Sequence, residues 1–133
     1  MKRILLAYDG GDPARRALDT TVELATKFGA TVGVISVIPI HVASMGVDPW
    51  DDREVHEAAL REAQTLLRER GIEAELIEPY GDPAQTIEAV ARERSYDAIV
   101  IGSRGQGAIG RFFAGSVSGH VAAHSGATVI VTH

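Results

Sequence analysis

The chain has 133 residues, of which 45% are apolar and 23% are charged, and its formal net charge at pH 7 is -5. This length suffices for one hydrophobic core and is too short for two ordinary domains, so we expect a single domain over residues 1–133. The excess of acidic residues argues against nonspecific binding of nucleic acid, because a phosphate backbone is held mainly by surplus lysine and arginine.

Short apolar runs rich in valine and isoleucine alternate with longer segments of helical periodicity, which is typical of stacked βαβ units. The first run, residues 4–8, is followed by Asp12 as a candidate N-cap, with Pro13 at the first helical position. Apolar residues then recur at helical spacing until Gly29, which is expected to end this helix. Residues 31–38 show almost no polar alternation and predict a strand that is buried on both faces.

A loop rich in proline, glycine and aspartate is expected over residues 39–52. Asp51 or Asp52 could cap a second helix, which is expected to stop at Gly71. The apolar face of this helix is expected to comprise Val55, Ala59, Ala63, Leu66 and Leu67. Residues 72–78 alternate apolar and charged side chains, as a half-buried strand near a sheet edge does.

The Asp-Pro start signal recurs at residues 81–83 and predicts a third helix. A strand at 98–101, a short helix at 116–124 and a last strand at 128–132 complete a βαβαβαβαβ order. Because parallel crossovers are right-handed, such a chain places helices on both faces of the sheet by reversing direction once. Ligands bind at that reversal, outside the carboxyl ends of the strands, and we expect the first and fourth strands to be adjacent there.

Nothing in the sequence indicates export or membrane insertion. The longest mostly apolar run, residues 31–40, is about half as long as a bilayer span requires, and charged side chains interrupt any signal-peptide core at the N-terminus. The chain has no cysteine, so it offers neither a disulfide framework nor a cysteine-based metal or redox site. We therefore expect a cytoplasmic protein without a membrane span.

The segment after the fourth predicted strand contains a G-x-G-x-x-G spacing at Gly105, Gly107 and Gly110. A dinucleotide fingerprint would need these glycines directly after an early strand, with an acidic residue about 20 positions further on, and that residue is absent here. A P-loop would need lysine and then serine or threonine after its last glycine, where this chain has Arg111 and Phe112. Both interpretations of the glycines are therefore poor.

A different spacing fits the expected fold better: Gly102, two residues, Gly105, nine residues, then Gly115 and Ser116. Gly102 ends the fourth strand and Gly105 lies in the turn after it. A missing Cβ there allows the backbone to approach a ligand closely or to take a positive φ. Gly115 and Ser116 open the next predicted helix, where unpaired N–H groups and the helix dipole favour an anion. The arrangement suits a chain of phosphates that lies between the strand end and the helix start.

This G-x2-G-x9-G-S pattern, together with Asp9 after the first strand, resembles the ATP-binding motif of the universal stress protein family. The resemblance extends along the whole chain, from ILLAYDG through VGVISV and YDAIVIGSRGQG to VAAHSGATVIVTH. It implies a Rossmann-like, adenine-nucleotide α-hydrolase-like fold: a single-domain α/β protein with an open parallel five-stranded sheet of order 3-2-1-4-5. It also implies a homodimer that pairs through the last strand, residues 128–132.

The resemblance further implies ATP as ligand, accompanied in some cases by magnesium or manganese, and no dedicated metal site is assigned. Asp9 would approach the ribose and the nearby phosphate, and Val37 would offer its backbone to the adenine. The full set of implied site residues is Ala7, Tyr8, Asp9, Val37, Ile101, Gly102, Arg104, Gly105, Gly115, Ser116 and Val117. One departure from the family is DGG in place of the more usual DGS after the first strand, which could alter a cap beside the ribose.

Several functions stay open from the sequence. The favoured one is an ATP-binding regulatory protein that reports to a protein partner, with no catalytic residue assigned. A slow ATPase or nucleotidyl transferase would use Asp9 to position a water or metal, and a nucleotide-free dimerisation or chaperone-like module would use the glycines structurally. His120 and His124 have the spacing of paired helical metal ligands, but Val121 replaces the glutamate of the zinc-protease pattern, so we interpret them as ordinary helix residues.

Overall fold

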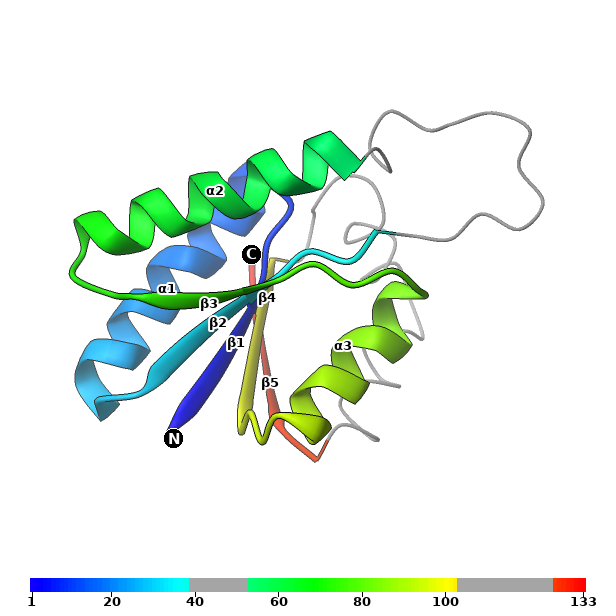
Figure 1. The fold of residues 1–133 in the computed structure, drawn as a ribbon. Helices are drawn as coiled ribbons and strands as arrows, with labels where there is room; N and C mark the ends of the chain where they lie inside the picture. The colour runs from blue at the N-terminus through cyan, green and yellow to red at the C-terminus, as the bar shows by residue number, and fades with distance from the viewer. Residues whose placement is uncertain (39–52, 103–125) are drawn as a thin grey trace, which may run out of the picture.

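The fold is an open parallel sheet with helices on both faces, seen in a computed structural model that describes residues 1–38, 53–102 and 126–133 (Figure 1). The strands are β1 (Arg3–Ala7), β2 (Thr31–Ile35), β3 (Ala74–Ile77), β4 (Ala98–Gly102) and β5 (Thr128–Thr132). The helices are α1 (Asp12–Phe28), α2 (Arg53–Glu69) and α3 (Pro83–Glu93). The sheet order is β3-β2-β1-β4-β5 with every neighbouring pair parallel, which confirms the expected topology and the adjacency of β1 and β4.

Each face of the sheet has its own apolar core, because side chains along a strand alternate between the two faces. Helices α1 and α2 cover one face and α3 covers the other (Figure 1). Along β1, Ile4 and Leu6 pack under α1 and α2, whereas Leu5 and Ala7 pack on the α3 side. Burial of all four residues explains why the first strand reads as a continuous apolar run.

The predicted helix ends are mostly correct, and one start is shifted. Gly29 ends α1 in the left-handed conformation, with φ 64°, and its N–H donates to the Ala25 carbonyl. Asp82 caps α3 by accepting a hydrogen bond from the Gln85 N–H at 3.1 Å. For α1, however, the N-cap is Gly11 rather than Asp12, and Gly11 has no side chain to accept a hydrogen bond.

Two strands are shorter than the sequence predicted, and β4 is one residue longer than the predicted 98–101. The regular pairing of β2 ends at Ile35 rather than Ile38, and beyond it only an isolated parallel bridge joins Ile38 to Tyr80. β3 is shorter than the predicted 72–78, and it is an edge strand with exposed side chains, as expected. The predicted loop at 39–52 and helix at 116–124 lie outside the described residues. No helix in the described ranges is long and apolar enough to cross a membrane.

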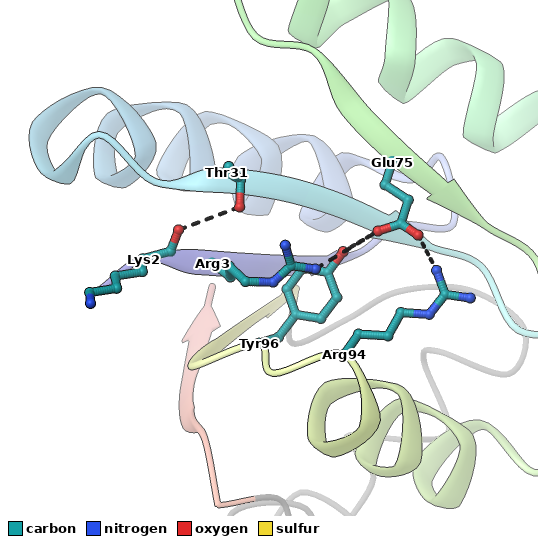
Figure 2. Close-up of polar contacts among 6 residues, drawn as sticks. All are labelled: Lys2, Arg3, Thr31, Glu75, Arg94 and Tyr96. Atoms are coloured by element: carbon teal, nitrogen blue, oxygen red, sulfur yellow. Dashed lines mark hydrogen bonds and ion pairs between the residues drawn. The ribbon is translucent and has the colours of Figure 1, made fainter.

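A polar network joins β3, β2 and β1 on the α3 side of the sheet (Figure 2). Tyr96 precedes β4, and its ring passes over Gly33 of β2 so that its hydroxyl donates to Glu75 of β3 at 2.9 Å. Arg94 pairs with the same carboxylate, and the Arg3 guanidinium lies 4.5 Å from the centre of the Tyr96 ring. One tyrosine therefore connects the strands on both sides of β2.

Candidate functional site

The predicted site residues that the structure describes gather at the carboxyl edge of the sheet. Ala7 ends β1, and its partners in the register are Ile35 of β2 and Ile101 of β4. The described members of the predicted site are Ala7, Tyr8, Asp9, Val37, Ile101 and Gly102. Their strand ends are adjacent in the order β2-β1-β4, so residues distant in sequence meet at one edge.

The other predicted site residues lie outside the described part of the chain. They are Arg104, Gly105, Gly115, Ser116 and Val117, and the histidines at 120 and 124 are outside it as well. Within the described residues, no group of three histidine, aspartate or glutamate side chains could hold a metal ion.

Asp9 shapes the turn between β1 and α1. Its Oδ1 accepts a hydrogen bond from the Gly11 N–H at 3.1 Å, and between them Gly10 has a φ of 88°, which favours glycine. The Asp9 carboxylate thereby closes the turn that leads into α1, whose N-cap Gly11 has no side-chain acceptor of its own. It also places negative charge at the positive end of the helix dipole. A turn-capping carboxylate keeps acceptor capacity for a ligand, so this role and the predicted one are compatible.

Val37 lies at the carboxyl end of β2 with its peptide groups directed toward β1. Its neighbours hydrogen bond in the opposite direction: Ser36 N–H donates to Ile77 at 3.1 Å, and Ile38 N–H donates to Pro79 at 2.8 Å. In extended backbone, successive residues direct their peptide groups to opposite sides, so the N–H and C=O of Val37 face β1. Among the described residues, no hydrogen bond between backbone groups involves Val37, and its side chain is buried on the α3 side.

Gly102 ends β4 where the first turn of α1 crosses the sheet edge. A Cβ at this position would lie 2.5 Å from the backbone carbon and oxygen of Pro13. The sequence predicted that the missing Cβ would admit a ligand, and the structure gives it an additional reason, which is close packing against the backbone of α1. Glycine at 102 therefore brings the start of α1 into contact with the end of β4.

Tyr8 forms the base of this edge on the side of α1 and α2. Its side chain is fully buried, and its hydroxyl lies near the ion pair in which Arg15 of α1 contacts Glu62 of α2 at 2.7 Å. Burial raises the Tyr8 pKa to about 12, and the negative charge of Glu62 acts in the same direction. Tyr8 is thus a core residue whose side chain packs on the α1 and α2 side of the sheet, directly after the end of β1.

The two buried tyrosines make stability sensitive to alkaline pH. Burial raises the pKa of Tyr96 to about 12 as well, assisted by its hydrogen bond to Glu75. An acid with a raised folded pKa favours folding below its unfolded value, here 10.0, and loses that contribution as pH rises toward about 12. We expect the free energy of unfolding, measured by urea titration, to fall across this interval.

The matched control for the alkaline prediction is the double variant Tyr8→Phe with Tyr96→Phe. It lacks both phenols, so its stability should fall less steeply over the same interval, although it starts from a lower value. Parallel curves for the variant and the native protein would contradict the assignment.

A buried pair of polar side chains behind the site was not predicted. Ser36 Oγ lies 2.6 Å from Nδ1 of His56 in the first turns of α2, and both residues are buried. The signal was present in the sequence, because His56 precedes Ala59, Leu60 and Ala63 at the spacings of one helix face. The same spacing around Ile87 places Glu88, which is also buried, on the sheet side of α3.

Comparison with known proteins decides the family. The sequence model of the Universal stress protein family matches residues 1–133. The chain belongs to the universal stress protein family. A universal stress protein of Thermus aquaticus is 31% identical, with 98% of this chain and 97% of the relative covered. The universal stress protein YxiE of Bacillus subtilis (strain 168) is 29% identical, with 97% of each covered.

Solved universal stress proteins have the same fold. One from Archaeoglobus fulgidus, solved in complex with dAMP, is 27% identical and superposes with a TM-score of 0.76, covering 100% of this chain and 98% of that one. The fold is therefore the adenine nucleotide α-hydrolase-like fold that the sequence indicated. The observed strand order, β3-β2-β1-β4-β5, is the order that the resemblance to this family implied.

Proposed function

We propose that this protein binds an adenine nucleotide, with ATP as its ligand, at the carboxyl edge formed by β2, β1 and β4. The observation that carries the proposal is that the peptide groups of Val37 face β1, at the strand end that the Asp9 turn follows. Further support comes from family membership and from the solved relative that holds dAMP. The base and the ribose each have a chemically suitable counterpart at this edge.

The Val37 peptide suits the base. An adenine edge carries an amino donor next to a ring nitrogen acceptor, and a peptide C=O with its N–H is the complementary pair. Because the Val37 N–H and C=O both face β1, they would pair with such an edge without any side chain. Ile101, which is buried at the end of β4, would flank the base.

The Asp9 turn suits the ribose and the first phosphate. A carboxylate accepts hydrogen bonds from ribose hydroxyls, and the start of α1 lies directly after it. We assign the phosphate tail to Arg104, Gly105, Gly115, Ser116 and Val117 on their sequence pattern. Magnesium or manganese would neutralise phosphate charge where it accompanies the nucleotide.

We further propose that ATP acts as a regulatory ligand in a cytoplasmic homodimer that communicates with a protein partner. A ligand that binds only the folded state stabilises it by mass action. The free energy of unfolding would therefore rise with the concentration of ATP. The dimer would form through β5, because in the described ranges this strand pairs only with β4 and leaves its other edge for a second chain.

Base recognition by the Val37 peptide predicts discrimination between ATP and ITP. In ITP an acceptor oxygen replaces the amino donor and the adjacent ring nitrogen carries a proton, so both hydrogen bonds would be lost. We expect calorimetric titration to show ITP binding about 10 to 100-fold more weakly than ATP. Equal affinity for the two nucleotides would contradict recognition of the base by a peptide group. Counting product in a single-turnover experiment would show separately whether ATP is hydrolysed.

A further inference from the structure

The Ser36–His56 hydrogen bond lies directly behind the peptide assigned to the base. Ser36 immediately precedes Val37, and its side chain points to the α2 side, opposite to that of Val37. The 2.6 Å contact with His56 Nδ1 joins the end of β2 to the fourth residue of α2. Both partners are at most 5% exposed, so this contact is shielded from water.

Beyond Ile35, whose carbonyl accepts a hydrogen bond from the Tyr8 N–H of the β1 side at 3.1 Å, the backbone hydrogen bonds seen in the described residues around Val37 all lie on the β3 side. Ser36 N–H is held by Ile77, and Ile38 is held through both its N–H and its carbonyl, which accepts from Gly81 at 3.0 Å. These bonds hold residues 36–38 against the β3 side. They do not prevent this segment from rotating about its own long axis, so side chains must resist that rotation. The Ser36 hydroxyl provides that resistance, because it is anchored on a different element, α2.

A buried polar pair carries a desolvation cost that apolar side chains in the same space would not carry. Two apolar side chains of similar volume would pack at least as well, whereas a serine–histidine pair must satisfy each partner to avoid a desolvation cost. A hydrogen bond differs from apolar packing in its directional geometry, which confines the angle between the two groups. The distinctive effect of this pair is therefore orientation of the backbone at Ser36 and Val37.

We propose that Ser36 and His56 are positioning residues that orient the Val37 peptide for recognition of the nucleotide base. Neither side chain contacts the ligand in this proposal, and it rests on the proposed nucleotide site. Either the serine hydroxyl donates to Nδ1 or the protonated Nδ1 donates to the hydroxyl oxygen, and both arrangements impose the same geometry.

The test is the ratio of ITP to ATP dissociation constants, measured by calorimetry on the full chain. Ser36→Ala removes the hydroxyl and should reduce the native ratio of about 10 to 100 to within about threefold. Ser36→Thr retains a hydroxyl and should keep most of the ratio. His56→Asn offers an amide near the position of Nδ1 and should restore discrimination that His56→Leu loses, so the result does not depend on one variant folding.

A matched control separates positioning from general destabilisation. Val22→Ala truncates a buried side chain of α1 on the same face of the sheet and should lower stability while leaving the nucleotide ratio unchanged. If the native protein discriminates and Ser36→Ala keeps the native ratio, the positioning role is wrong and the proposed function stands. If the native protein binds neither nucleotide, the proposed function itself fails, and the positioning role fails with it.

Discussion

Gly102→Ala is expected to destabilise the protein by about 3 kcal/mol or more, or to prevent it from folding. The new Cβ would lie 2.5 Å from the backbone carbon and oxygen of Pro13. Backbone atoms cannot rotate away as a side chain can, so either α1 shifts away from β4 or the end of β4 bends. Both movements would disturb the carboxyl edge at which Asp9 and Ile101 meet.

Gly71→Ala is the matched control for the Gly102 prediction. Gly71 has a φ of 80°, but no atom lies within 4 Å of the position of its Cβ. Substitution there introduces backbone strain without a collision and should cost only about 1 kcal/mol. Urea unfolding of the two variants would compare the cost of the collision at position 102 with the cost of the backbone strain at position 71. A Gly102→Ala variant no less stable than Gly71→Ala would show that the start of α1 is not packed on β4 as described.

Gly33→Ala is expected to cost about 2 to 3 kcal/mol for a different reason. Its Cβ would overlap the Tyr96 hydroxyl and lie 2.7 Å from Cζ of the same ring. The ring would have to leave β2, and its hydrogen bond to Glu75 and its stacking with Arg3 would be lost with it (Figure 2). The loss should appear in urea unfolding as a lower midpoint.

A compensating substitution tests the cause. Tyr96→Leu shortens the side chain that crosses β2, so adding Gly33→Ala to it should cost less than about 1 kcal/mol further. The two substitutions would then be strongly non-additive, as expected for residues in direct contact. Additive costs would mean that alanine at position 33 destabilises the sheet without involving Tyr96. No such rescue is expected for Gly102, because its obstacle is backbone.

The sequence was sufficient to predict the strands, the parallel topology and the adjacency of the first and fourth strands, because these depend on local signals. Apolar runs, Asp-Pro starts and a glycine stop are readable within a few residues, as Asp82 and Gly29 show. The strand order came from the family resemblance. The α1 cap was misassigned to Asp12, because the carboxylate that serves the turn is Asp9, which precedes the helix by several residues.

The contacts that sequence reasoning missed are those between distant segments. Ser36 meets His56 across the chain, and Gly33 accommodates Tyr96, with nothing local to either residue that identifies its partner. β2 ends early at Ile35 because the chain beyond it pairs with the segment after β3 instead of with β1, which depends on the geometry of three strands at once. Because the strands diverge there, the Val37 peptide faces β1 without a backbone hydrogen bond to it among the described residues.

The most direct test of the proposed nucleotide site is a titration of nitrogen-15-labelled protein with ATP, followed through its backbone amide resonances. Binding at the proposed site predicts saturable shifts concentrated at the carboxyl edge, with the amides of Val37, Asp9 and Gly102 among the most affected. Amides at the amino ends of the strands, such as Arg3, should change little. Absence of saturable shifts, or saturable shifts that leave Val37 and Asp9 unchanged, would contradict the nucleotide site.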